Sequence, residues 1–171
     1  MDAGDSSHDA QAGDTAEPNP SEMTEGSWSI SAFDDDTPAR GFLQMCAERR
    51  FHRAIQDKFE ELTGLEHYQY WIHTDAGGSP KMNHRLHKVA PDYCYGQPGM
   101  EIMGWAAHGT KCGGYPPNTP DDTIQGDLIR MLSIRIDNYP RADHYAFFAE
   151  EEKTDPPRVK LWWTGPHKKS P

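Results

Sequence analysis

The chain is poor in several features that would narrow its class. It has three cysteines, no long apolar run, and no lysine or arginine in its first 36 residues. A membrane-spanning helix needs about 18 or more consecutive apolar residues, and because the chain has no such run we expect no association with a membrane. The N-terminus also lacks the basic start and apolar segment of a secretory signal, so we expect a cytoplasmic protein.

The acidic residues are concentrated at one end of the chain. The formal net charge is −10, from 27 Asp and Glu against 17 Lys and Arg. Ten of the 27 acids lie in residues 1–36, which leaves 17 acids against 17 basic residues in the remainder. This distribution predicts a disordered acidic tail over 1–36 and a single, formally neutral domain over 37–171. The domain offers no basic groove, so we expect no nucleic-acid partner.

The cysteines themselves suggest a chemistry. Cys46, Cys94 and Cys112 are odd in number and far apart in the sequence. Without an export signal, that pattern does not favour a disulfide framework. Thiolates and imidazoles bind soft metals, and His108 precedes Cys112 in the glycine-rich stretch GWAAHGTKCGG. We therefore expect thiolate chemistry, with metal binding as the candidate role.

Apolar and aromatic runs predict the strands. Four runs are typical of strands, the first of them buried and the second ending in a glycine loop, and a fifth, after a Pro-Pro turn, is typical of an antiparallel edge. They cover 41–46, 68–78, 100–108, 144–152 and 158–164.

Helical spacing predicts two helices between these strands. The first runs from Phe51 to Leu62 and ends at Gly64, and the second starts at a cap, Thr119 or Asp121, and ends before Pro140. The polar segment 79–99 has room for one short helix among its prolines, Pro80, Pro91 and Pro98. Together the order of elements predicts an α/β fold with a mostly parallel β-sheet of four to five strands flanked by helices.

Polar and small residues gather where the predicted strands end. Cys46 ends the first strand, and His108 ends the third. Asp75 and the pair Gly77–Gly78 end the second, and Cys112 lies just beyond the third. Because sites form at the carboxyl ends of parallel strands, we expect these residues to lie close together.

The same positions carry a family resemblance. Cys46, Glu48 and Arg50 form a Cys-x-acid-x-Arg motif, an Ala-Gly-Gly loop follows the second strand, and the His108/Cys112 pair precedes Gly-Gly. Over about residues 41–152 this combination resembles the β-class carbonic anhydrases. The resemblance implies a β-carbonic-anhydrase-like fold, a homodimer, and a lyase that reversibly hydrates CO₂ to bicarbonate through zinc-bound hydroxide.

The resemblance also implies a role for each residue. Cys46, His108 and Cys112 would bind Zn²⁺ and leave its fourth position to water. Glu48 would orient the nucleophile, and Arg50 would hold Glu48. The loop Asp75, Ala76, Gly77 and Gly78 would border the CO₂ pocket, although Asp75 is equally suited to shaping a tight turn.

The chain departs from the family pattern at two points. Glu48 stands where the family has aspartate, and three residues rather than two separate His108 from Cys112. An alternative is therefore a catalytically silent zinc-binding protein with a regulatory or interaction role. Hydrolysis of a CO₂-like molecule, CS₂ or COS, is a further alternative on the same scaffold.

Other ligands are also conceivable from the sequence. Cys94 as a fourth ligand would make the site structural, and His73 would have to displace a member of the expected set. His84 and His87 lie three apart in a polar segment, where solvated histidines are the simpler interpretation.

Overall fold

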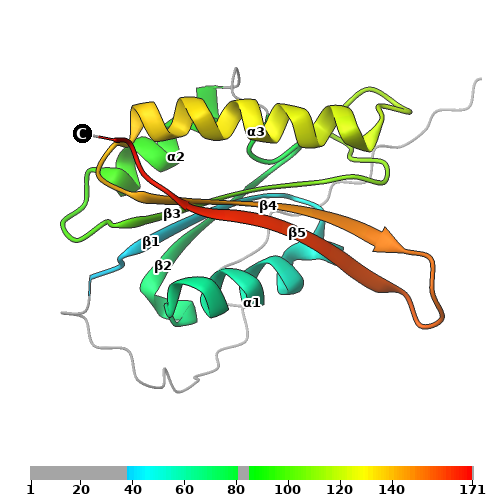
Figure 1. Ribbon diagram of the computed structural model, residues 1–171, viewed down its shortest axis with the longest axis horizontal. Coiled ribbons are helices and arrows are strands. Elements are labelled where there is room, and N and C mark those ends of the chain that lie inside the picture. Colours follow the sequence, from blue (N-terminus) through cyan, green and yellow to red (C-terminus); the bar gives the residue numbers. More distant parts are fainter. Residues whose placement is uncertain (1–37, 81–84, 171) are drawn as a thin grey trace, which may run out of the picture. The chain divides into compact units, whose positions relative to one another are not determined.

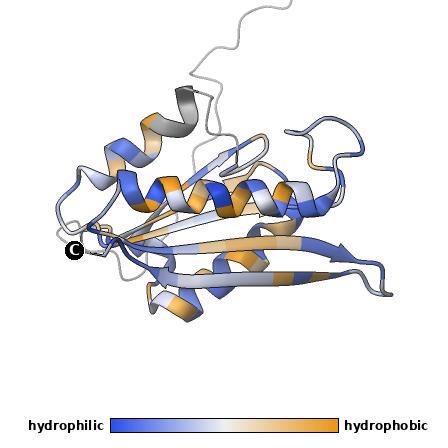
Figure 2. Cartoon of the chain, turned by 45° about the horizontal axis from the view of Figure 1, so that its top comes forward, coloured by the Kyte–Doolittle hydropathy of each residue, from blue (hydrophilic) through white to orange (hydrophobic). Residues whose placement is uncertain are grey.

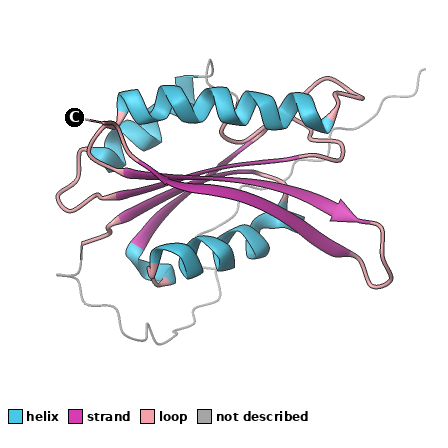
Figure 3. Ribbon diagram, viewed as in Figure 1, coloured by secondary structure: helices cyan, strands magenta, loops and turns pink. Residues whose placement is uncertain are grey.

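The computed structural model describes residues 38–80 and 85–170, so the acidic tail expected at 1–36 lies outside the described residues. The described part forms an α/β fold (Figure 3), as the sequence predicts. In chain order its strands and α-helices are β1 (Gly41–Cys46), α1 (His52–Thr63), β2 (Tyr70–Asp75), α2 (Arg85–Tyr95), β3 (Ile102–His108), α3 (Asp121–Asn138), β4 (Asp143–Glu152) and β5 (Arg158–His167).

The five strands form a single sheet in the order β2-β1-β3-β4-β5. The first four are parallel, and β5 runs antiparallel to β4 as the predicted edge strand. The crossovers place α1 on one face of the sheet and α2 and α3 on the other (Figure 1). The carboxyl ends of β1, β2 and β3 therefore meet at one edge of the sheet, which is the condition for the predicted site.

Each face of the sheet has its own apolar cluster. Successive strand residues point to opposite faces, so Phe42 packs with the cluster under α3 whereas Leu43 packs with the cluster over α1. Figure 2 shows hydrophobic positions recurring along α3 between hydrophilic ones. These include Ile124, Leu128 and Leu132, which are buried against the sheet. The sheet is therefore packed against apolar side chains on both of its faces.

The helix ends agree only partly with the sequence. Gly64 ends α1 in the left-handed conformation, with φ of 70°, as its position predicts. The predicted cap of α3 is wrong. Pro120 is the N-cap residue and Asp121 is the first helical residue, and no described side chain makes a capping hydrogen bond at this end. Pro91 lies inside α2 rather than breaking it. In the part of the chain that the structure covers, no helix is both long and apolar enough to cross a membrane.

Candidate metal centre

The site lies where β1 and β3 separate. Residues 41–44 of β1 pair with residues 102–105 of β3. Beyond these residues the two strands no longer pair, and Ser79 lies between them. The Ser79 hydroxyl accepts a hydrogen bond from the Ala106 amide at 2.9 Å and donates one to the Gln44 carbonyl at 3.2 Å. Sequence analysis missed Ser79, because a serine in a turn gives no signal that it will bridge two strands. The gap that it spans gives the ligands room to converge.

The glycine loop after β2 packs closely against this opening. Gly78 has φ of 61°, and a Cβ there would lie 2.5 Å from the Ala106 oxygen and 2.9 Å from the Cys46 nitrogen. A Cβ at Gly114 would lie 2.2 Å from the Gly77 Cα atom. Side chains do not fit at such distances, so glycine is required for the loop to pass between the segments that carry Cys46 and Cys112.

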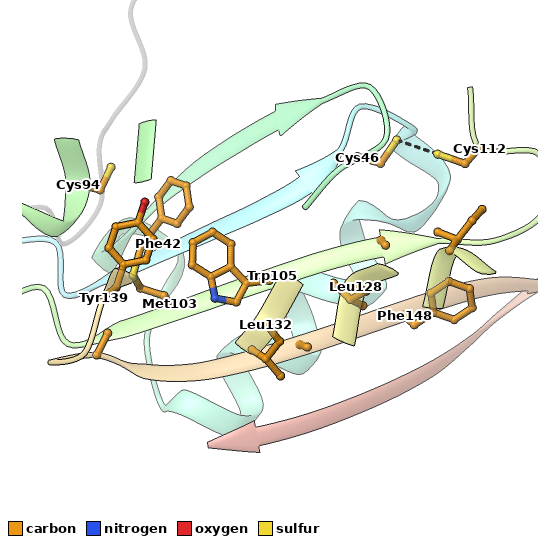
Figure 4. Close-up of a cluster of buried hydrophobic side chains, with 14 of the residues drawn as sticks. Phe42, Cys46, Cys94, Met103, Trp105, Cys112, Leu128, Leu132, Tyr139 and Phe148 are labelled. Carbon is orange, nitrogen blue, oxygen red and sulfur yellow. Dashed lines mark hydrogen bonds between the residues drawn. The ribbon is translucent and has the colours of Figure 1, made fainter. Parts of the chain in front are cut away.

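Three side chains converge there as the sequence predicts. The ligand atoms of Cys46, His108 and Cys112 all lie within 4.8 Å of one another, and all three residues are buried. The two sulfurs are 3.8 Å apart (Figure 4). Tetrahedral zinc with Zn–S bonds of about 2.3 Å requires sulfurs about 3.8 Å apart, so the pair fits that ion without rearrangement.

His108 is prepared to act as a ligand through one nitrogen. Its Nδ1–H donates to the Gly109 carbonyl at 2.6 Å, so in the neutral ring Nε2 is the unprotonated nitrogen. Nε2 is buried and makes no hydrogen bond of good geometry to any described atom, although the Cys46 sulfur lies close enough to the ring to influence it. Phe51 stacks on the imidazole, with ring centroids 4.6 Å apart, and fixes its plane. A buried acceptor without a partner costs about 1–3 kcal/mol, and a bound metal ion would remove that cost.

The sulfurs and the imidazole influence one another strongly. A hydrogen bond from Cys112, aided by His108, lowers the pKa of the Cys46 thiol to about 4 despite its burial. The same contact with Cys46, followed by burial, raises the pKa of Cys112. Burial alone would lower the pKa of His108, but the Cys46 sulfur and the Gly109 carbonyl together raise it. Without metal, the pair therefore favours one thiolate and one thiol.

Glu48 and Arg50 form the predicted ion pair beside the ligands. Arg50 Nε lies 3.1 Å from Glu48 Oε1, and the Arg50 backbone N–H donates to the same oxygen at 3.2 Å. These contacts hold the pKa of Glu48 below its usual value. Arg50 also donates to Glu151 at 2.6 Å, a second anchor on β4 that the sequence did not indicate. The Glu48 carboxylate is therefore ionised and fixed in direction.

Asp75 shapes the turn that carries the glycines. Its Oδ1 accepts from the Ala76 amide at 2.7 Å, and its carbonyl accepts from the Gly78 amide at 3.0 Å. The Asp75 carbonyl also accepts from the Ala47 amide at 3.0 Å, which ties the loop to the chain just after Cys46. Of the two roles that the sequence left open for Asp75, the hydrogen bonds support the structural one.

The alternative ligands do not join the set. Cys94 lies at the far end of the apolar cluster from Cys46 and Cys112 (Figure 4), and burial raises its pKa to about 11. His73 Nδ1 accepts a hydrogen bond from Gln44 Nε2 at 3.3 Å. His84 and the side chain of His87 fall outside the described residues. Within residues 38–80 and 85–170, three protein ligands therefore make up the cluster.

Comparison with known proteins adds no assignment. No protein-family model matches the sequence, and no curated protein matches it at a significant level. The geometry of the site is therefore the basis for any functional proposal.

Proposed function

We propose that the protein is a zinc-dependent, carbonic anhydrase-like lyase that reversibly hydrates CO₂ to bicarbonate. The observation that supports this most is the buried cluster of Cys46, His108 and Cys112, whose ligand atoms lie within 4.8 Å of one another, together with a His108 Nε2 that has no hydrogen-bond partner among the described residues. CO₂ and bicarbonate are the proposed small-molecule partners.

The donor set favours zinc over harder cations. Two sulfurs and one imidazole are soft or borderline ligands, which suit Zn²⁺ and not Mg²⁺ or Ca²⁺. Structural zinc sites use four protein ligands, whereas catalytic sites use three and leave one position open. Zinc bound by Cys46, His108 and Cys112 would supply a water acidic enough to act as a nucleophile near neutral pH.

Glu48 and Arg50 would provide the orientation that this chemistry needs. Two thiolates neutralise the charge of the ion, so a group that aims the nucleophile becomes important. The Glu48 carboxylate would accept a hydrogen bond from the attacking oxygen and direct it at the carbon of CO₂. Arg50, held from the other side by Glu151, would keep that carboxylate from rotating away.

The glycine loop would form one wall of the CO₂ pocket. Gly78 lies against the backbone of Cys46, and Gly77 lies against Gly114 in the segment of Cys112, so this part of the loop presents backbone without side chains. A small apolar molecule needs no polar partner there, which suits CO₂ and also the related CS₂ and COS.

A homodimer is part of the same proposal. Trp71 of the edge strand β2 is 45% exposed, and it packs edge-on against Tyr93 of α2, which is 61% exposed, with ring centroids 6.4 Å apart. Large apolar side chains exposed together suit an interface. Sedimentation of the purified protein tests this: a dimer is expected, and a monomer at all concentrations would exclude it.

Stopped-flow CO₂ hydration on zinc-loaded protein tests the activity. We expect hydration well above the buffer rate, its loss in Cys46→Ser, and a loss of about 10–100-fold in Glu48→Gln, the usual effect of removing a group that orients a ligand of the metal. The matched variant Glu151→Gln should lose less, because Arg50 still holds Glu48. A zinc-loaded protein no faster than buffer would exclude the lyase; turnover of CS₂ or COS in its place would assign the hydrolase.

The second candidate is a catalytically silent zinc-binding protein with a regulatory or interaction role. It is favoured by the extra methylene of Glu48 and by the engagement of both its carboxylate oxygens with Arg50, Oε1 at 3.1 Å and Oε2 at 3.4 Å. A stoichiometric zinc protein without hydration activity would support it. A large gain in rate in Glu48→Asp would instead indicate an enzyme weakened by the longer side chain.

A further inference from the structure

A single peptide unit links the imidazole of His108 to a carboxylate on another element. The carbonyl of Gly109 accepts the Nδ1–H of His108 at 2.6 Å. The N–H of Thr110, which belongs to the same planar peptide, donates to Asp121 Oδ1 at 2.8 Å. Asp121 opens α3, so the first residue of a helix is connected to a candidate metal ligand at the end of β3.

We propose that Asp121 is a positioning residue for the metal centre, acting on His108 through the peptide between Gly109 and Thr110. The inference rests on the proposed zinc site, and it adds a residue that the family resemblance does not include. Histidines that bind metals commonly donate their other nitrogen to a carboxylate or a carbonyl. Here the imidazole donates to the Gly109 carbonyl, and the N–H of the same peptide donates to the Asp121 carboxylate.

These two linked hydrogen bonds have two consequences for His108. A carboxylate at the Thr110 N–H polarises the peptide and makes the Gly109 carbonyl a stronger acceptor, since linked hydrogen bonds reinforce one another. A stronger acceptor at Nδ1 fixes the tautomer with Nε2 free and makes Nε2 a better donor to a metal. The position of Asp121 at the start of α3 suits a negative charge.

Packing shows that the contact with Asp121 also sets the path of the loop. A Cβ at Gly109 would lie 2.3 Å from the Asp121 carboxyl carbon, so the carboxylate rests directly on the Gly109 backbone. Thr110 and Lys111 follow with φ of 51° and 64°, a conformation that costs non-glycine residues about 1 kcal/mol or more each. The hydrogen bond to Asp121 offsets part of this cost in the loop that places one residue more than the family pattern between His108 and Cys112.

Zinc affinity of two matched variants tests the proposal. Asp121→Asn removes the charge and keeps the shape, whereas Asp122→Asn removes the same charge from an exposed neighbour in the same helical turn. Competition with a chromophoric chelator should show Asp121→Asn binding zinc about 10–100-fold more weakly than wild type, the usual effect of losing such a partner. Asp122→Asn should stay within about twofold, because the general electrostatic effect of one exposed charge is small.

A measurement on the wild-type protein keeps the test independent of variant folding. NMR should detect a coupling across the hydrogen bond between the Thr110 amide nitrogen and the Asp121 carboxyl carbon, and a His108 tautomer with the proton on Nδ1. In Asp121→Asn the His108 Nδ1–H resonance should move upfield, whereas a purely structural role for Asp121 would leave it in place. Absence of the coupling would overturn the proposal.

The outcomes separate this proposal from the activity. Wild type that binds zinc without hydrating CO₂, with weaker binding in Asp121→Asn, excludes the lyase and supports the role of Asp121. Equal affinities of Asp121→Asn and Asp122→Asn overturn the role of Asp121 and leave the lyase intact. Wild type that binds no zinc overturns both.

Discussion

His108 and His144 are both buried histidines, on the neighbouring strands β3 and β4, yet their surroundings differ. His144 uses both nitrogens: Nδ1 accepts from the Trp105 indole N–H at 3.0 Å, and Nε2 donates to the Tyr139 carbonyl at 2.9 Å. His108 uses one nitrogen, its Nε2 has no hydrogen-bond partner among the described residues, and its ring lies in the cluster with two sulfurs. Burial of a histidine alone therefore does not indicate a function, whereas a buried ring nitrogen that lacks a hydrogen-bond partner does.

The cysteines repeat the contrast at the two ends of the sheet. Cys94 is surrounded by apolar groups, and burial raises its pKa to about 11. Cys46 is also buried, but its contact with Cys112 lowers its pKa to about 4. One thiol packs among apolar groups, and the other is favoured as a thiolate within a cluster that could hold a metal ion.

The largest expected effect concerns the cysteines. Cys46→Ser should lower the zinc content from about one ion per chain to less than about a tenth, because a hydroxyl is a poor zinc ligand. Cys94→Ser should keep the full zinc content, although it places a hydroxyl in the core. Metal analysis after dialysis measures both. Equal zinc content in the two variants would contradict the assignment of Cys46, and not Cys94, to the metal centre.

The histidines should separate metal binding from stability. His144→Phe leaves the Trp105 N–H and the Tyr139 carbonyl without partners, so we expect a loss of about 2–5 kcal/mol in unfolding free energy with unchanged zinc content. His108→Phe should lose zinc while the metal-free protein keeps its stability within about 1 kcal/mol, because the lost hydrogen bond to the Gly109 carbonyl is offset by removal of the unpartnered Nε2. Urea unfolding of the metal-free proteins measures the first quantity. The reverse pattern would show that the roles of the two histidines are exchanged.

Substitutions of two glycines compare how tightly the site loop and an ordinary helix end are packed. Gly78→Ala should cost about 2–4 kcal/mol, since its Cβ would lie 2.5 Å from the Ala106 oxygen in addition to the strain of a positive φ. Gly64→Ala shares a positive φ, but its Cβ would meet no described atom within 4 Å, so we expect about 1 kcal/mol. Thermal unfolding measures both. Equal losses would mean that the site loop can move aside.

The smallest effect is the pH dependence that His144 adds to stability. Burial lowers its pKa below the ordinary value of about 6.5, so as the pH falls the unfolded chain takes up a proton before the folded one does. Its contribution is therefore complete above about pH 6.5 and falls at lower pH by at most about 1.4 kcal/mol per pH unit. The stability gap between wild type and His144→Phe should narrow from pH 7.5 to 5.5. A constant gap would show that His144 titrates alike in both states.

The sheet could be predicted well because its strands are short apolar runs with clear limits. The strand predicted at 41–46 is β1 without a change of bounds, and the edge strand at 158–164 lies within β5. The helix ended by Gly64 is also confirmed. Such features depend on local residue types, so one sequence is enough to find them.

The details that failed depend on tertiary contacts. Asp121 has the residue type of a helix cap, but its carboxylate is used by the Thr110 N–H instead. A proline inside a helix predicts a break, yet α2 continues through Pro91. Phe51 was recognised as a core residue of a helix, while its stacking on His108 could not be read from spacing.

The site was predictable as a set of residues and not as a geometry. Strand ends indicated which side chains would meet, and the structure brings Cys46, His108 and Cys112 within 4.8 Å. The bridge made by Ser79 and the second anchor of Arg50 at Glu151 join segments far apart in the sequence. Nothing in their local sequence distinguishes them from ordinary surface or turn residues.

X-ray absorption at the zinc edge of the metal-loaded protein tests the central claim most directly. The account predicts one zinc per chain with two sulfurs at about 2.3 Å, one imidazole nitrogen at about 2.0–2.1 Å and one further light atom. The number of sulfur ligands should fall from two to one in Cys112→Ser and stay at two in Cys94→Ser. A shell of three sulfurs, or one of oxygen and nitrogen alone, would contradict it.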